Sequence, residues 1–330
     1  MAYAAAMAMI STFALAGCSS GAGTMSRSGT LNGALAHVAD TANNRSAIYF
    51  DDTAELYRLT GPSPDYGKGF GVLIGWGASS ITEYALSLPA DTGIDLFKES
   101  FAITAGSPPA TLTLIDGGQD ASLVTSRMTR LGWKPGGGAL AAPSPAAAWV
   151  NGINYALPMT TVRADGANAA FGGAGAELSQ IGSPTGATLA SDPEVSALAS
   201  CLGTVVAAEF SADHEVGGKR PAALAAGVRT PASGTDTPRA VACVEWPTED
   251  AASQYAAALR RALSTGKSVT GEPYATLLTQ SNVTAIGGQL HIVQWTASTP
   301  ARADQVFQLL EDSDLPGLST CARPSISGCH

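Results

Sequence analysis

Charged residues are scarce in this sequence, and cationic residues are the scarcest. Lys and Arg together number 18 against 27 Asp and Glu, so the formal net charge is −9, and only 14% of the residues are charged. Proteins that bind nucleic acid gather Lys and Arg on one face or along one helix. No segment of this chain does so, and the composition therefore disfavours a nucleic-acid partner.

Long apolar runs are missing from the body of the chain. The run over residues 69–81, GFGVLIGWGASSI, is broken by glycine and is shorter than the roughly 20 residues that a membrane-spanning helix needs. Hydrophobic residues still make up 45% of the 330 residues. That fraction predicts a substantial core, in one large domain or two smaller ones.

The histidines and cysteines do not have the spacing of metal ligands. No two cysteines are two to four residues apart, and no histidine follows another ligand by three to five residues, as the common zinc motifs require. We therefore expect no metal site and no cofactor.

The N-terminal segment has the features of an export signal. Residues 4–17 are small and apolar, about as long as the central region of a signal peptide and too short to cross a bilayer as a helix. The sequence Leu15-Ala16-Gly17-Cys18 resembles the lipobox of bacterial lipoproteins, although no Lys or Arg precedes it. The alternative is a buried N-terminal helix with a free thiol.

The lipoprotein resemblance implies a specific processing and location. Residues 1–17 would be the signal peptide, and Cys18 would become the first mature residue and carry lipid such as palmitate. Each buried methylene of an acyl chain contributes about 0.8 kcal/mol, so two chains hold a folded domain on a membrane. In organisation the chain resembles the uncharacterised lipoproteins of high-GC Gram-positive bacteria, which implies a cell-membrane anchor and an extracytoplasmic location.

Four cysteines remain if Cys18 carries lipid. An even number in an exported protein predicts two disulfides, with three possible pairings. We favour Cys201–Cys243, which would join the end of a helical segment to a strand, and Cys321–Cys329, which would close a short loop at the C-terminus.

The chain divides into a tether and two similar parts. Residues 18–46 are rich in Ser, Gly, Thr and Asn, which predicts a flexible tether. A short helix within it is compatible with the sequence. The sequence then predicts a first half over 47–210 and a second half over 211–330.

Two segments have the same pattern of an alternating strand, a turn and an amphipathic helix. They are residues 110–133 and 240–263, and each is followed by a hairpin with a tight turn, at Asp165-Gly166 and Gly287-Gly288. The pattern predicts an α+β fold with antiparallel sheets covered by helices on one face. It also predicts two similar halves of the order strand–strand–helix–strand–strand–helix, with a last helix after Thr299-Pro300.

Two polar segments have the residue types of a catalytic or metal-binding site. Residues 51–55, DDTAE, place three carboxylates together, but Asp52 and Glu55 have the spacing of a helix capping box. Asp213-His214-Glu215 has the side chains of a metal or base site, yet lies in a polar loop. The five tryptophans can line an apolar groove or fill a core.

No catalytic constellation is complete, so we assign no catalytic residue. The sequence favours a lipid-anchored protein that binds or scaffolds at the cell envelope, more in keeping with a binding protein than with an enzyme. Its expected partners are the membrane, through lipid on Cys18, and an apolar envelope ligand or another protein. The alternative is an envelope hydrolase in which a serine or carboxylate acts with His214 or His291.

Overall fold

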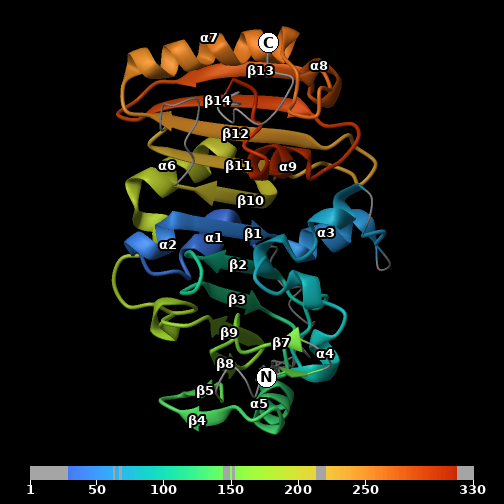
Figure 1. Cartoon of the computed structure of the whole chain (residues 1–330), viewed down its shortest axis with the longest axis vertical. Helices are drawn as coiled ribbons and strands as arrows, with labels where there is room; N and C mark the ends of the chain where they lie inside the picture. The colour runs from blue at the N-terminus through green and yellow to red at the C-terminus, as the bar shows by residue number, and fades with distance from the viewer. Residues whose placement is uncertain are drawn as a thin grey trace, which may run out of the picture.

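The computed structural model describes residues 29–61, 64–66, 69–143, 153–212 and 221–317, and the backbone at 149–150. These residues form one antiparallel sheet of twelve strands with helices packed against it, which confirms the α+β class (Figure 1). The strand order is β13-β14-β12-β11-β10-β1-β2-β3-β9-β8-β5-β4, and a separate short hairpin joins β6 and β7.

The strands of this sheet and of the short hairpin have the following bounds. They are β1 (Ala47–Asp51), β2 (Phe101–Ala105), β3 (Leu112–Asp116), β4 (Lys134–Gly136), β5 (Ala139–Ala141), β6 (Trp149–Val150), β7 (Ile153–Asn154), β8 (Thr161–Asp165), β9 (Asn168–Gly172), β10 (Val205–Ser211), β11 (Ala223–Arg229), β12 (Arg239–Trp246), β13 (Thr279–Ile286) and β14 (His291–Ser298).

The helices lie between these strands in the chain. The α-helices are α1 (Leu31–Leu35), α2 (Ala42–Ser46), α3 (Thr53–Thr60), α4 (Leu88–Asp91), α5 (Ala121–Arg130), α6 (Pro193–Leu202), α7 (Glu249–Thr265), α8 (Tyr274–Leu277) and α9 (Gln305–Glu311). The 3-10 turns are η1 (Gly69–Leu73), η2 (Trp76–Ala78), η3 (Thr82–Tyr84), η5 (Leu178–Gln180) and η6 (Leu189–Ser191).

The strand order repeats on the two sides of the central pair β1 and β10. Outward from β1 come β2, β3, β9 and β8, and outward from β10 come β11, β12, β14 and β13. In both cases a helix, α5 or α7, precedes the hairpin of the last two strands. One sheet therefore runs through both predicted halves, whereas the similarity of the two halves stays a prediction.

Helices cover both faces of the sheet, so the prediction of one covered face is wrong. One face packs under α3, α5, α7 and α9, and the other under α1 and α6. The reason lies in the sequence of β10, β11 and β12, where consecutive residues are almost all buried. A strand that is apolar on both sides needs a cover on both sides.

The part of the predicted tether from residue 29 onward belongs to the folded core, so the flexible tether is wrong for residues 31–46. Thr30 and Thr41 cap α1 and α2 by accepting hydrogen bonds from backbone amides. The apolar side chains of α1 and of Val38 follow a helical spacing and are buried against the sheet. The sequence predicts a tether because Ser, Gly, Thr and Asn dominate the composition of the whole segment, whereas the apolar spacing extends over only eight residues.

The last helix also begins later than predicted. The sequence places its start after Thr299-Pro300, but α9 begins at Gln305, with Asp304 at its N-cap. The apolar side chains of this region, Ala303, Val306, Phe307 and Leu310, are all buried. The region 79–87 forms turns and η3 before α4 begins.

Truncating a side chain in the central strand tests how much the fold depends on this strand. Phe50 of β1 is fully buried and its ring lies 6.4 Å from that of Phe101. We expect Phe50→Ala to lower the free energy of unfolding by about 3–5 kcal/mol, through lost burial and the cavity left behind. Urea unfolding measures the change. Leu86→Ala, at a side chain that is 86% exposed, is the control, with an expected change within about 0.5 kcal/mol. Equal effects of the two substitutions would contradict this account of the core.

Candidate functional site

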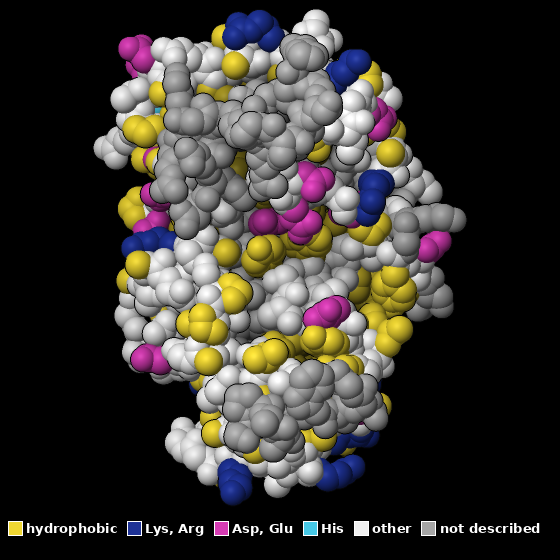
Figure 2. Space-filling view, in the orientation of Figure 1, with side chains coloured by type: hydrophobic (Ala, Val, Ile, Leu, Met, Phe, Trp, Pro, Cys, Tyr) yellow, Lys and Arg dark blue, Asp and Glu magenta, His cyan; other side chains and the backbone are white. Residues whose placement is uncertain are grey.

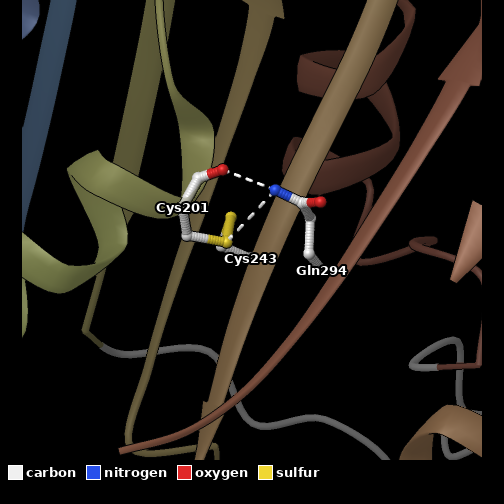
Figure 3. Close-up of a disulfide and its surroundings, with 3 residues drawn as sticks. All are labelled: Cys201, Cys243 and Gln294. Atoms are coloured by element: carbon white, nitrogen blue, oxygen red, sulfur yellow. Dashed lines mark hydrogen bonds between the residues drawn. A yellow bond between two sulfur atoms is a disulfide. The ribbon is translucent and has the colours of Figure 1, made fainter. Parts of the chain in front are cut away.

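A disulfide joins Cys201 to Cys243 (Figure 3). Cys201 lies in the last turn of α6 and Cys243 in the middle of β12, and both are buried. The pairing confirms the prediction that this bridge ties the end of a helix to a strand. It fixes α6 on the face of the sheet opposite α7 and α9.

Gln294 lies beside the disulfide on the neighbouring strand. It is the residue of β14 that pairs with Cys243, and its Nε2 atom donates a hydrogen bond of 2.6 Å to the carbonyl oxygen of Cys201 (Figure 3). Carbonyls in the last turn of a helix have no partner within the helix. Gln294 supplies one, so the end of α6 is held by a covalent bond and by a hydrogen bond.

Several predicted site residues lie outside the described residues: Cys18, His214, Cys321 and Cys329. His291 is described. It begins β14 opposite Trp246, and no described serine or carboxylate hydrogen-bonds its ring. Among the described residues no group of three or more His, Cys, Asp or Glu is placed to hold a metal ion.

The three carboxylates of residues 51–55 have different partners in the structure and do not form one site. Asp52 caps α3, since its Oδ1 accepts a hydrogen bond of 3.1 Å from the amide of Glu55. The reciprocal half of the predicted capping box is wrong, because the Glu55 side chain takes two hydrogen bonds from Arg58 instead, at 2.6 and 2.7 Å. Asp51 is buried on the face of the sheet that packs against η2.

A polar hollow of about 440 Å³, which the sequence does not predict, lies beside His37. We call it the His37 hollow. Its floor is aliphatic, from Leu114 and Ala170, and its wall is polar, from His37, Arg163, Asp165 and Asn168. Serine and threonine hydroxyls of the segment 179–185 complete the rim. The sequence places His37 in the tether and therefore predicts no site at this residue, whereas the structure places it in the wall of the hollow.

The side chains of the His37 hollow are held in place by backbone groups. The Nδ1 atom of His37 lies 2.6 Å from the carbonyl oxygen of Gly182, so Nδ1 carries a hydrogen and Nε2 faces away from this bond as the second polar atom of the ring. The guanidinium of Arg163 donates to the carbonyls of Leu178 and Ile181, at 3.0 and 2.7 Å. The hollow therefore presents both donors and acceptors from fixed positions.

A second hollow of about 440 Å³ lies where α1, α3 and the end of α6 meet. Asp52 and Glu55 line it together with hydroxyl groups, including those of Thr30 and Ser200. Burial, with the charges of Glu55 and Asp51, raises the pKa of Asp52 to about 7. Both carboxylates have protein partners, since Asp52 accepts from the amide of Glu55 and Glu55 accepts from the side chain of Arg58.

Two further carboxyl groups are buried in the sheet. Burial and the charge of Glu311 raise the pKa of Glu209 to about 8, and burial with the charges of Glu194 and Asp192 raises that of Glu245 to about 7. Figure 2 shows acidic side chains gathered in the middle of one face, where α9 and β10 lie, with Lys and Arg toward its edges.

Three of the described tryptophans fill the core, one of the two roles that the sequence allows them. Trp133, Trp246 and Trp295 are at most 5% exposed and belong to the core. The indole of Trp133 donates to the carbonyl of Met159 at 2.9 Å. No helix among the described residues has both the length and the hydropathy needed to span a bilayer.

Comparisons with known proteins give two distant structural similarities. No protein-family model matches the chain, and no curated protein matches it either. Two crystal forms of TP0453, form I and form III, are similar to the chain at 13% identity, with TM-scores of 0.43 and 0.40. The alignments cover 84% and 83% of this chain and 96% and 98% of TP0453.

The disulfide generates a prediction about stability. Cys201 and Cys243 are 42 residues apart, and a cross-link over a loop of this size typically stabilises a protein by about 2–4 kcal/mol. We expect the double substitution Cys201→Ala and Cys243→Ala to lower the free energy of unfolding by that amount in urea. A reducing agent should lower the unfolding midpoint of the wild-type protein more than that of the double variant, which keeps only the predicted Cys321–Cys329 bridge. A reductant that moves both midpoints equally would contradict the assignment.

Proposed function

We propose that the chain is a lipid-anchored protein of the extracytoplasmic face of the cell membrane, which binds a small polar molecule in the His37 hollow. Lipid on Cys18 would attach it to the membrane. The observation that carries the location is the buried disulfide between Cys201 and Cys243. Disulfides persist in exported proteins and are rare in proteins of the cytosol.

The disulfide and the lipobox resemblance support the same compartment independently. The first depends on a side-chain contact within the fold, and the second on the order of residues 15–18. The described fold begins at residue 29, so the stretch 18–28 would separate the lipid from the domain. Eleven residues extend to at most about 40 Å, which would keep the domain close to the membrane surface.

The chemistry of the His37 hollow favours a ligand rich in hydroxyl groups, such as a neutral sugar. Its wall offers donors and acceptors together, and its charged side chains, Arg163 and Asp165, are of opposite sign. Pockets of this kind combine an apolar floor with a few placed polar groups. A hydroxyl group both donates and accepts, so it suits a wall of this composition.

The lipid anchor is tested by replacing Cys18. We expect wild-type protein, expressed in a bacterium that acylates exported lipoproteins, to incorporate an alkyne-labelled fatty acid and to sediment with membranes. Cys18→Ala should incorporate none and be lost from the membrane fraction, because the thioether attachment point is gone. The double variant at positions 201 and 243 is the control and should keep its lipid. Absence of label from the wild-type protein would refute the anchor.

Ligand binding is tested by filling the hollow. Ser179 is an exposed residue of its rim, and Ser179→Trp should occupy the space without disturbing the core. We expect saturation-transfer NMR against a panel of neutral monosaccharides and disaccharides to give a signal with the wild-type protein. The variant should lose at least about tenfold in affinity, the effect of about 1.4 kcal/mol. Ser264→Trp, at an exposed position elsewhere, should bind as the wild type does. Equal binding by both variants, or no binding by any, would refute this site but not the lipid anchor.

A further inference from the structure

Two buried carboxyl groups share one hydroxyl group near the centre of the sheet. The Oγ1 atom of Thr53 lies 2.7 Å from Oδ2 of Asp51 and 2.8 Å from Oε1 of Glu99. Asp51 and Thr53 are fully buried and Glu99 is 3% exposed. We call these residues, Asp51, Thr53 and Glu99, the proton-sharing triad.

The other contacts of the two carboxyl groups are unequal. Asp51 accepts hydrogen bonds from two backbone amides, that of Gly75 at 3.1 Å and that of Gly77 at 2.8 Å. The second oxygen of Glu99, Oε2, is buried and has no hydrogen-bond partner among the described residues. Asp51 therefore has two backbone donors besides Thr53, whereas Oε2 of Glu99 has no donor among the described residues.

A count of hydrogens assigns the protonation. A threonine hydroxyl carries one hydrogen and can direct it at one acceptor. At its second contact the threonine oxygen must accept, and a carboxyl group donates only when it is protonated. Asp51 is stabilised as an anion by its amide donors, so the proton resides on Glu99, which donates to Thr53, and Thr53 donates to Asp51.

The charges around the triad oppose a second negative charge. Burial, followed by the charge of Asp51, raises the pKa of Glu99 well above its usual range, and Asp95 adds to the effect. Burial also raises the pKa of Asp51 against the hydrogen bonds that it accepts. The other titratable groups that face the triad are Asp52, at the start of α3, and Tyr57, further along it. Asp95 is paired with Lys98 at 2.9 Å.

The amides that Asp51 binds belong to a turn that contacts both the sheet and α9. The hydroxyl of Thr104 donates to the carbonyl of Gly77 at 2.7 Å, and the ring of Trp76 is stacked on that of Phe307 in α9 at 4.4 Å. A side chain at position 77 would come within 2.6 Å of the Asp51 carboxylate. The turn thus lies directly on the triad, and no side chain fits between them.

We propose that the proton-sharing triad makes the attachment of residues 69–78 to the sheet dependent on pH. With one proton in the triad, the chain of hydrogen bonds from Glu99 to Thr53 to Asp51 is complete and the turn is held. Loss of that proton places two carboxylates on one hydroxyl in a buried site, and the turn loosens together with its contact to α9.

The sign of the effect follows from linkage. A carboxyl group whose pKa is raised in the folded state binds its proton more tightly there than in the open state. The attachment is therefore strongest in acid, and it weakens as pH rises above the usual carboxyl pKa and through the raised one. For one proton, the equilibrium between the attached and the loosened turn changes by at most about tenfold per pH unit.

Hydrogen–deuterium exchange of the full chain tests the proposal. Protection factors for peptides within 69–80, corrected for the intrinsic effect of pH on exchange, are measured between about pH 5 and about pH 8. We expect protection in the wild-type protein to fall at least tenfold over this range. Glu99→Gln should keep its protection, because the amide donates to Thr53 at every pH.

Controls separate the triad from the general effect of buried acids. Glu245→Gln removes another buried carboxyl of raised pKa, in β12, and should keep the wild-type profile in 69–80. Thr53→Ser retains the hydroxyl and should do the same. Peptides from β11 and β12 should change less than the turn does. Protection in 69–80 that is independent of pH in the wild-type protein would overturn the proposal without any variant. So would a Glu99→Gln variant that is as sensitive to pH as the wild type, or loss of the effect in Glu245→Gln.

Discussion

The pairing of β1 with β10 is the contact on which the rest of the fold depends. Five residues of β1, Ala47–Asp51, pair antiparallel with β10, and the two strands are far apart in the sequence. Each of them begins one side of the sheet, and the same order of strands follows on both sides (Figure 1). Without this pair the sheet would separate into two smaller sheets, each with a long exposed edge.

Burial of both faces of the sheet has a consequence for its polar residues. A strand covered on both sides has no solvent face on which to place a carboxylate, and yet Asp51, Glu209 and Glu245 lie on covered strands. A buried carboxylate must be hydrogen-bonded or become neutral. Asp51 takes the first solution, and Glu99 of the triad takes the second. The buried acids therefore make the fold more stable in mild acid than in alkali.

Local sequence patterns predicted the outer parts of the sheet well. The hairpins at Asp165-Gly166 and Gly287-Gly288, the helices α5 and α7 and the strand before each of them are present, because turn residues and alternation act within a few positions. The centre was harder to predict. Strands β10 and β11 are rich in alanine and show no alternation, since both of their sides are buried.

The candidate sites could be predicted only in part. The bridge between Cys201 and Cys243 follows from the number and context of the cysteines. The His37 hollow does not, because it joins a residue of the supposed tether to a hairpin more than one hundred residues later. The sequence places Asp51 and Thr53 of the triad next to a helix cap at Asp52, which is a local signal. It does not predict the contact with Glu99, because that contact depends on the pairing of β1 with β2.

The two outermost strands of the sheet differ in their capacity to pair with another chain. At one end β4 is three residues long and contains Pro135, which has no amide hydrogen to offer. At the other end β13 is eight residues long, but its register slips between Thr279 and Asn282. A break in register and polar side chains make an edge a poor template for aggregation. Molecules of this protein packed side by side on a surface would therefore have little tendency to fuse their sheets.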